Sequence, residues 1–232
     1  MDYKKFINYF KRWDGMHMLG LGTMAVGFLM LWLGGAYSYV MALLGAPFLA
    51  IGFVAFLYGN VGRASENDLL EQMKRTREGI HFEEINEDRH FRGRVPQILR
   101  EELLDGYTFS DDESILIKKQ RSGTIISSEY TVAKLAVLKD AFYIKTKTFS
   151  FISDKKEEMT YEILFDQIEN AEVVRSEKVL TRDKKSYHVK TCDVVITYDG
   201  GKTLTLHRKD DIYADGLIDT IRYAIEDAKK RA

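Results

Sequence analysis

Two clusters of basic residues give this sequence its clearest binding chemistry. The first is Lys118-Lys119-Gln120-Arg121, and the second lies between residues 178 and 185. Several donors that converge on one point can hold a phosphate group, and two separated loops can converge at the mouth of a folded sheet. Glu177 and Asp183 dilute the second cluster, so a solvated rim is the alternative. The candidate lipid-binding residues are Lys118, Lys119, Arg121, Lys178, Arg182, Lys184 and Lys185.

The segment from His81 to His90 has the residue types of a metal site. On a helix, Glu83, Glu87 and His90 would share one face, and Glu87 with His90 has the i, i+3 spacing of di-iron bundles. Such bundles need a second copy of the pattern, and the sequence has none. A charged surface connector is therefore favoured, and we expect no metal and no cofactor.

The common catalytic constellations are missing from the sequence. Gly20 and Gly22 lie in an apolar run rather than in a phosphate-binding loop. No serine occupies a nucleophile-elbow pattern, and no histidine pair has zinc-protease spacing. His188 and Cys192 are four residues apart in a loop-then-strand context, which does not bring them together. We expect a protein that is not an enzyme.

The longest single feature of the sequence is an uncharged run from Gly15 to Gly62, which contains no Asp, Glu, Lys or Arg. A membrane-spanning helix needs about 20 apolar residues, so the run predicts two spans, at 16–33 and 39–58. The turn between them is expected at Gly34–Ser38. A cleaved signal peptide is disfavoured because the second apolar segment follows at once.

The charges beside the spans predict their orientation. Basic residues stay on the cytoplasmic side, and they occur only before the first span and after the second. The sequence therefore predicts a multi-pass protein of the cell membrane with both termini in the cytoplasm. Net charge is −1, which gives no pull toward nucleic acid, and the single cysteine suits a reducing compartment. The flanking basic residues are Lys4, Lys5, Lys11, Arg12, Arg63, Lys74, Arg75 and Arg77.

Small residues recur regularly within the spans. Seven-residue spacing keeps them on one helix face, where they let helix backbones approach closely. We expect the glycine rows to pack within the hairpin; alternatively, a row of Ala42, Ala46 and Ala50 meets another subunit of a homo-oligomer. The predicted helix-packing residues are Gly20, Gly27, Gly34, Gly45, Gly52 and Gly59.

The chain after the spans changes from helical to alternating patterns. Ser65 starts a short helix, and a second is expected at Gln97–Leu104, after Pro96. Alternating apolar runs from Ser114 onward predict an antiparallel sheet, followed by an amphipathic helix from Asp211 to about Lys229. The expected strands are Ser114–Lys118, Gly123–Ser127, Lys134–Leu138, Phe142–Lys147, Glu158–Leu164, one beginning at Ala171–Val174, Cys192–Tyr198 and Thr203–His207.

Three segments carry a resemblance to a known family. They are Leu135–Ile144, Phe165–Val173, and the Asp199-Gly200 hairpin with its closing helix. Together they resemble a bacterial pleckstrin-homology-like (PH-like) domain, related to GRAM domains, over approximately Phe109 to Lys229. The sequence departs from the family at Leu138 and Ala141, where threonine and arginine are usual. The resemblance implies a binding role, and in eukaryotic relatives a basic first hairpin grips lipid phosphates.

These observations predict a membrane-anchored α+β protein. Its parts are an N-terminal cytoplasmic segment (1–14), a transmembrane hairpin (15–62), a charged helical connector (63–108) and a PH-like curled antiparallel sheet closed by a C-terminal helix (109–232). We expect a non-enzymatic scaffold or adaptor that presents its domain to a protein partner. One alternative is a sensor of anionic lipid headgroups, and another is an accessory subunit of a transport or secretion complex.

Overall fold

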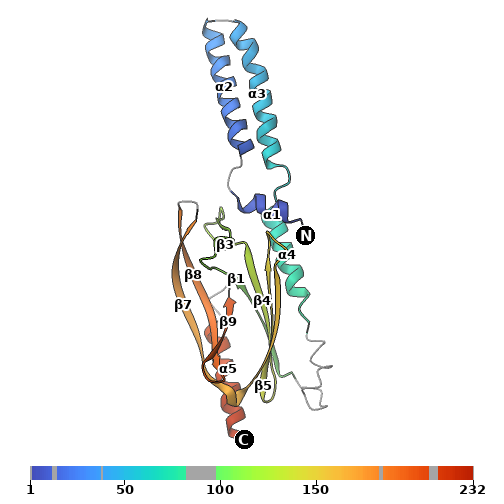
Figure 1. Ribbon diagram of the computed structural model, residues 1–232, viewed down its shortest axis with the longest axis vertical. Helices are drawn as coiled ribbons and strands as arrows, with labels where there is room; N and C mark the ends of the chain where they lie inside the picture. The colour runs from blue at the N-terminus through green and yellow to red at the C-terminus, as the bar shows by residue number, and fades with distance from the viewer. Residues whose placement is uncertain are drawn as a thin grey trace. The chain divides into compact units, whose positions relative to one another are not determined.

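The computed structural model describes residues 2–11, 15–37, 39–81, 98–182, 185–208 and 214–231. The chain forms two compact units, Met1–Ser65 and Glu66–Ala232. In the described residues, the regular elements of the first unit are helices, and the second unit combines antiparallel strands with two α-helices (Figure 1).

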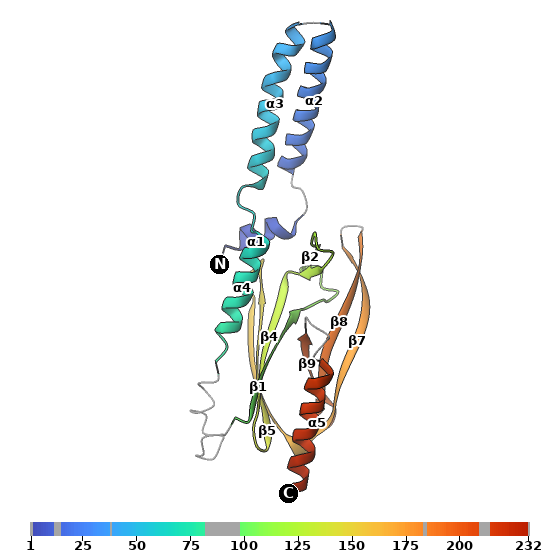
Figure 2. The same cartoon turned by 180° about the vertical axis from the view of Figure 1, so that it is seen from behind.

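The first unit contains two long apolar helices, α2 (Gly15–Tyr37) and α3 (Tyr39–Asn60), which lie side by side in both views (Figures 1 and 2). Both are long and apolar enough to cross a membrane, and little of either apolar stretch is buried. This confirms two apolar helices of spanning length. The expected turn at Gly34–Ser38 is too long, because α2 continues to Tyr37. In an apolar medium, a continued helix satisfies backbone groups that a wider turn would leave unpaired.

A short amphipathic helix, α1 (Tyr3–Phe10), precedes α2. Asp2 caps it by accepting a hydrogen bond from the Lys5 backbone N–H at 3.4 Å. Phe6, Tyr9 and Phe10 are buried, and the Lys5 carbonyl accepts from the Ala64 N–H at 3.0 Å. The N-terminal segment is thus tied to the chain that follows α3.

The second unit begins with α4 (Glu66–Glu78), as the capping pattern at Ser65 predicts. Leu69 and Met73 are its most buried side chains. Met73 Sδ accepts a hydrogen bond from the Tyr107 hydroxyl at 3.6 Å, and Arg77 Nη2 donates to the Tyr130 hydroxyl at 3.0 Å. These contacts fix α4 to the neighbouring sheet.

That sheet has four antiparallel strands in the order β1-β4-β5-β6. The helix expected at Gln97–Leu104 is wrong, because the chain from Arg100 onward is strand β1. β1 pairs with β4 along its whole length, from Arg100 opposite Val137 to Tyr107 opposite Tyr130. Pairing and the burial of Leu104 override the helical propensity of this segment. The strands are β1 (Arg100–Tyr107), β4 (Glu129–Val137), β5 (Ala141–Ser150) and β6 (Lys156–Leu164).

Two further groups of strands complete the second unit. A small hairpin is formed by β2 (Ile117–Lys119) and β3 (Ile125–Ser127). After the short 3-10 helix η3 (Phe165–Gln167), three strands form a second antiparallel sheet, and α5 (Ala214–Arg231) follows them. These three strands are β7 (Ile168–Arg182), β8 (Lys185–Tyr198) and β9 (Lys202–Arg208).

The main core lies between the two sheets and α5. Buried side chains from the four-stranded sheet, such as Phe142, share one cluster with Val194 of β8 and Ile221 of α5. The sheets also meet at Gly106 of β1, where a Cβ atom would lie 3.0 Å from the Arg208 backbone nitrogen of β9. Antiparallel sheets closed by a C-terminal helix are therefore confirmed.

Candidate anion-binding surface

The structure brings the two predicted basic segments together. Ile117 of β2, Leu180 of β7 and Val189 of β8 form one buried apolar cluster, with partly buried Phe109 and Tyr187 packed against it. The β2–β3 hairpin accordingly lies beside the end of the long β7–β8 hairpin (Figures 1 and 2). Apolar burial across segments far apart in sequence thus places the basic residues of both hairpins at one end of the domain.

Local hydrogen bonds shape the β2–β3 hairpin. The Gln120 N–H donates to the Thr124 carbonyl at 2.8 Å, and the Gly123 N–H donates back to Gln120 at 3.1 Å. Gly123 has a φ of 90°, a conformation that side chains disfavour. Lys119 at the end of β2 and Arg121 in this turn are exposed, and neither forms an ion pair in the part of the chain that the structure describes.

The second basic segment does not form the expected loop. Lys178 and Arg182 lie in β7 and Lys185 begins β8, while Lys184 lies outside the described residues. Lys178 is exposed and Lys185 is half-buried. Neither of these lysines has an ion-pair partner among the described residues. This half of the basic surface is therefore built on strands.

The guanidinium of Arg182 bonds to backbone carbonyl groups through both of its terminal nitrogens. Its Nη2 donates to the carbonyl oxygens of Ser110 at 2.9 Å and Asp112 at 3.0 Å. Its Nη1 donates to the Thr181 carbonyl at 2.9 Å. Arg182 therefore holds the segment before β2 against the end of β7, and its donors point to backbone rather than to a ligand.

A carboxylate accompanies these cations. The Ser114 backbone N–H donates to Asp112 Oδ1 at 2.8 Å, and this bond lowers the pKa of Asp112. Asp112 consequently stays ionised in the segment that Arg182 holds. An anion that approaches the hairpins therefore meets a mixed surface, because exposed Asp111 and Glu113 flank Asp112 in this segment.

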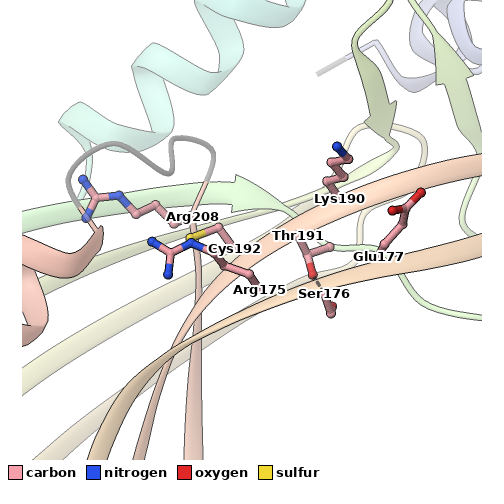
Figure 3. A pocket seen from close by; sticks show the side chains of 7 residues that line it. All are labelled: Arg175, Ser176, Glu177, Lys190, Thr191, Cys192 and Arg208. Carbon is pink, nitrogen blue, oxygen red and sulfur yellow. Dashed lines mark hydrogen bonds between the residues drawn. The ribbon is translucent and has the colours of Figure 1, made fainter.

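A polar hollow of about 450 Å³ lies further along the same strands (Figure 3). Arg175, Cys192 and Arg208 are direct register partners across β7, β8 and β9, and they line it together. The hydroxyls of Ser176 and Thr191 lie 2.7 Å apart and bond to each other. The sequence alone does not predict this site. Once the Asp199-Gly200 hairpin is recognised, its register places Cys192 opposite Arg208, but nothing in the sequence indicates the third strand.

The carboxylates around this hollow already have partners. Arg175 Nη2 lies 2.8 Å from Asp215 Oδ2, and Glu177 Oε1 lies 3.4 Å from His188 Nδ1. In an adjoining hollow of about 310 Å³, Asp193 Oδ1 lies 2.9 Å from His207 Nδ1. The hollow of about 450 Å³ is lined by three cationic side chains, Arg175, Lys190 and Arg208, and by one carboxylate, Glu177.

In the apolar helices, the two glycine rows line the contact between α2 and α3. A Cβ atom at Gly20 would lie 2.6 Å from the Phe56 backbone nitrogen, and one at Gly52 would lie 2.6 Å from the Met24 nitrogen. In contrast, a Cβ atom at Gly22 would meet nothing within 4 Å. The glycines that meet the facing helix in this way are Gly20, Gly27, Gly34, Gly45, Gly52 and Gly59.

The described residues contain no group of three or more His, Cys, Asp and Glu side chains that could hold a metal ion. The hypothesis of a site at Glu83, Glu87 and His90 concerns residues outside the described part of the chain. Comparison of the chain with protein-family models, with curated proteins and with solved structures gives no match.

Proposed function

We propose that this protein is a membrane-anchored, non-enzymatic module that binds anionic lipid headgroups at its paired basic hairpins. In this proposal α2 and α3 cross the membrane, and both termini face the cytoplasm. The second unit is a PH-like domain. A four-stranded and a three-stranded antiparallel sheet, followed by a helix packed into the core, support that assignment.

The observation that carries the proposal is the apolar cluster of Ile117, Leu180 and Val189. This cluster brings the exposed cations of two distant segments to one surface. Two unrelated solvated loops would not require a shared apolar cluster. Basic side chains at an anionic membrane surface contribute about 1 kcal/mol each. The exposed residues Lys119, Arg121 and Lys178 with half-buried Lys185 would together bind weakly and in a salt-dependent manner.

The test uses the full chain held in nanodiscs of neutral lipid. Co-sedimentation with phosphatidylglycerol vesicles is compared with co-sedimentation with neutral vesicles at low and high salt. We expect binding to the anionic vesicles that falls with salt and is lost in Lys119→Gln/Arg121→Gln. The control, Lys139→Gln/Lys230→Gln, removes two exposed charges outside the hairpins. Equal binding by the two double variants would refute the proposal.

A second candidate function, a scaffold for a protein partner, is favoured by strand β6. This strand is the outer edge of its sheet, so one side of its backbone has no neighbouring strand among the described residues. Met159 and Leu164 are exposed on it, and such edges can accept a strand from a partner. A photo-cross-linking residue at Thr160 should give a discrete adduct in membranes, whereas one at Glu226 of α5 should not. No adduct at Thr160 would exclude this edge as the docking site.

A further inference from the structure

Three cationic side chains surround the hollow on the second sheet. Arg175 and Arg208 lie on either side of Cys192 in one row across β7, β8 and β9. Because neighbouring strands are about 4.8 Å apart, the backbones of the two arginines are about 10 Å apart. Lys190 lies two residues from Cys192 on β8 and therefore on the same face. All three side chains line one hollow, and Figure 3 shows Arg175 and Arg208 on one side of it and Lys190 on the other.

Like charges gathered on one face of a sheet destabilise it unless opposite charges balance them. Asp215 balances Arg175, at 2.8 Å. Glu177 is the register partner of Lys190, yet its carboxylate lies within ion-pair distance of His188 instead. Lys190 and half-buried Arg208 form no ion pair within the ranges that the structure describes. Among the described residues, the hollow therefore presents two cations without an ion-pair partner, together with the Glu177 carboxylate.

We propose that this hollow is a binding site for a phosphate group, with Arg208 and Lys190 as its charged ligands. A guanidinium offers paired donors that match two phosphate oxygens, and an ammonium adds a mobile point charge. The hydroxyls of Ser176 and Thr191 bond to each other on the opposite face of these strands, so they are not ligands of this site. Arg175 stays with Asp215 and limits the site on the side of α5.

This site is distinct from the hairpin surface. The hairpin cations are Lys119, Arg121, Lys178 and Lys185, and none of them lines the hollow. A phosphate group could come from a lipid headgroup or from a small soluble molecule, and the chemistry of recognition is the same for both. The site therefore stands or falls independently of the proposed function.

The experiment uses the full chain in nanodiscs of neutral lipid and two probes. Binding of inorganic pyrophosphate is measured by isothermal titration calorimetry, and binding of phosphatidylglycerol vesicles is measured by co-sedimentation. We expect Arg208→Gln and Lys190→Gln each to raise the dissociation constant by at least about tenfold, the scale of one lost charge-assisted hydrogen bond. Lys139→Gln, which removes an exposed charge from the turn between β4 and β5, should have no effect.

Either of two results would support the site, and they distinguish a soluble phosphate compound from a lipid headgroup as its ligand. Pyrophosphate binding that Arg208→Gln and Lys190→Gln weaken, but Lys119→Gln/Arg121→Gln leaves intact, indicates a soluble phosphate compound. Vesicle binding that the same two variants weaken, without any pyrophosphate binding, indicates a lipid headgroup. If neither variant weakens either probe, the site does not exist.

Two variants that preserve the fold allow the site to be tested even if Arg208→Gln is destabilised. Arg208→Lys retains the charge but loses the paired donors, so it should bind between the wild type and Arg208→Gln. Exposed Lys190 has no ion-pair partner in the described chain, so Lys190→Gln should unfold at the wild-type temperature. If Arg208→Gln is destabilised, these two variants decide the outcome, and wild-type affinity in both overturns the proposal.

Discussion

Arg182 Nη2, near the end of β7, lies 2.9 Å from the carbonyl oxygen of Ser110, in the segment between β1 and β2. A second bond reaches the Asp112 carbonyl. Arg182→Gln should lose these bonds and lower the free energy of unfolding by about 1–3 kcal/mol. Urea unfolding followed by circular dichroism measures this loss.

Lys185→Gln removes the same charge on the facing strand, and it should change stability little. Equal midpoints for the two variants would show that Arg182 is not a structural tie.

Gly27 of α2 lies at the contact between the two apolar helices, so its replacement tests how closely they pack. A Cβ atom there would lie 2.6 Å from the Leu49 backbone nitrogen of α3, so Gly27→Ala must force the helices apart. We expect a lower thermal unfolding temperature in detergent micelles. Gly22→Ala is the matched control, since its Cβ meets nothing within 4 Å and alanine is the better helix former by about 1 kcal/mol. If both variants melt alike, the contact between α2 and α3 is looser than described.

Glu158 of β6 makes stability depend on pH on the acid side. Its hydrogen bond to Lys145 Nζ at 3.0 Å lowers its pKa in the folded state below the ordinary value of 4.5, and Lys147 adds to this. The stabilisation is complete above the unfolded-state pKa and disappears as pH falls through the folded-state pKa. The difference in stability between wild type and Glu158→Gln should therefore be constant from pH 6 to 8 and shrink below about pH 4.5. Urea titrations across this range measure it, and a constant difference down to pH 3 would contradict the assignment.

Membrane insertion of α2 and α3 can be tested at side chains on their outer surfaces. Val26 is 49 % exposed and Ile51 is 61 % exposed. A lysine at the centre of a span costs about 2.5–3.5 kcal/mol, so Val26→Lys/Ile51→Lys should move the protein from the carbonate-resistant membrane fraction to the extract. Val26→Leu/Ile51→Leu should stay in the membrane fraction. If the lysine variant also stays there, these faces do not contact lipid.

The apolar helices could be predicted almost completely from the sequence, because an uncharged run of this length has few other stable forms. Only their junction was misplaced: Gly34 and Gly35 suggested a turn, but both glycines remain in α2. Gly34 instead contributes to the close contact with α3. Glycine marks a turn in a soluble chain and a helix contact in a membrane span, and residue type alone does not distinguish the two.

Pairing between distant segments could not be predicted. The segment Arg100–Tyr107 has helical propensity but forms β1, because β4 supplies a complete hydrogen-bonding partner. The extension of β7 to Arg182 escaped prediction because Lys178 and Arg182 suggested a loop. The same extension creates both the hairpin surface and the row of Arg175, Cys192 and Arg208. Most strands followed from local alternation of apolar residues, and the closing helix followed from apolar residues at helical spacing.

The close approach of β1 to β9 at Gly106 and Arg208 has a consequence for biosynthesis. The apolar helices leave the ribosome long before β9, so they are available to the insertion machinery while the first strand of the sheet still lacks its last neighbour. Closure of the domain must wait until residues past Arg208 have been made. In the membrane-anchored protein that we propose, α2 and α3 would thus enter the bilayer before β1 can meet β9.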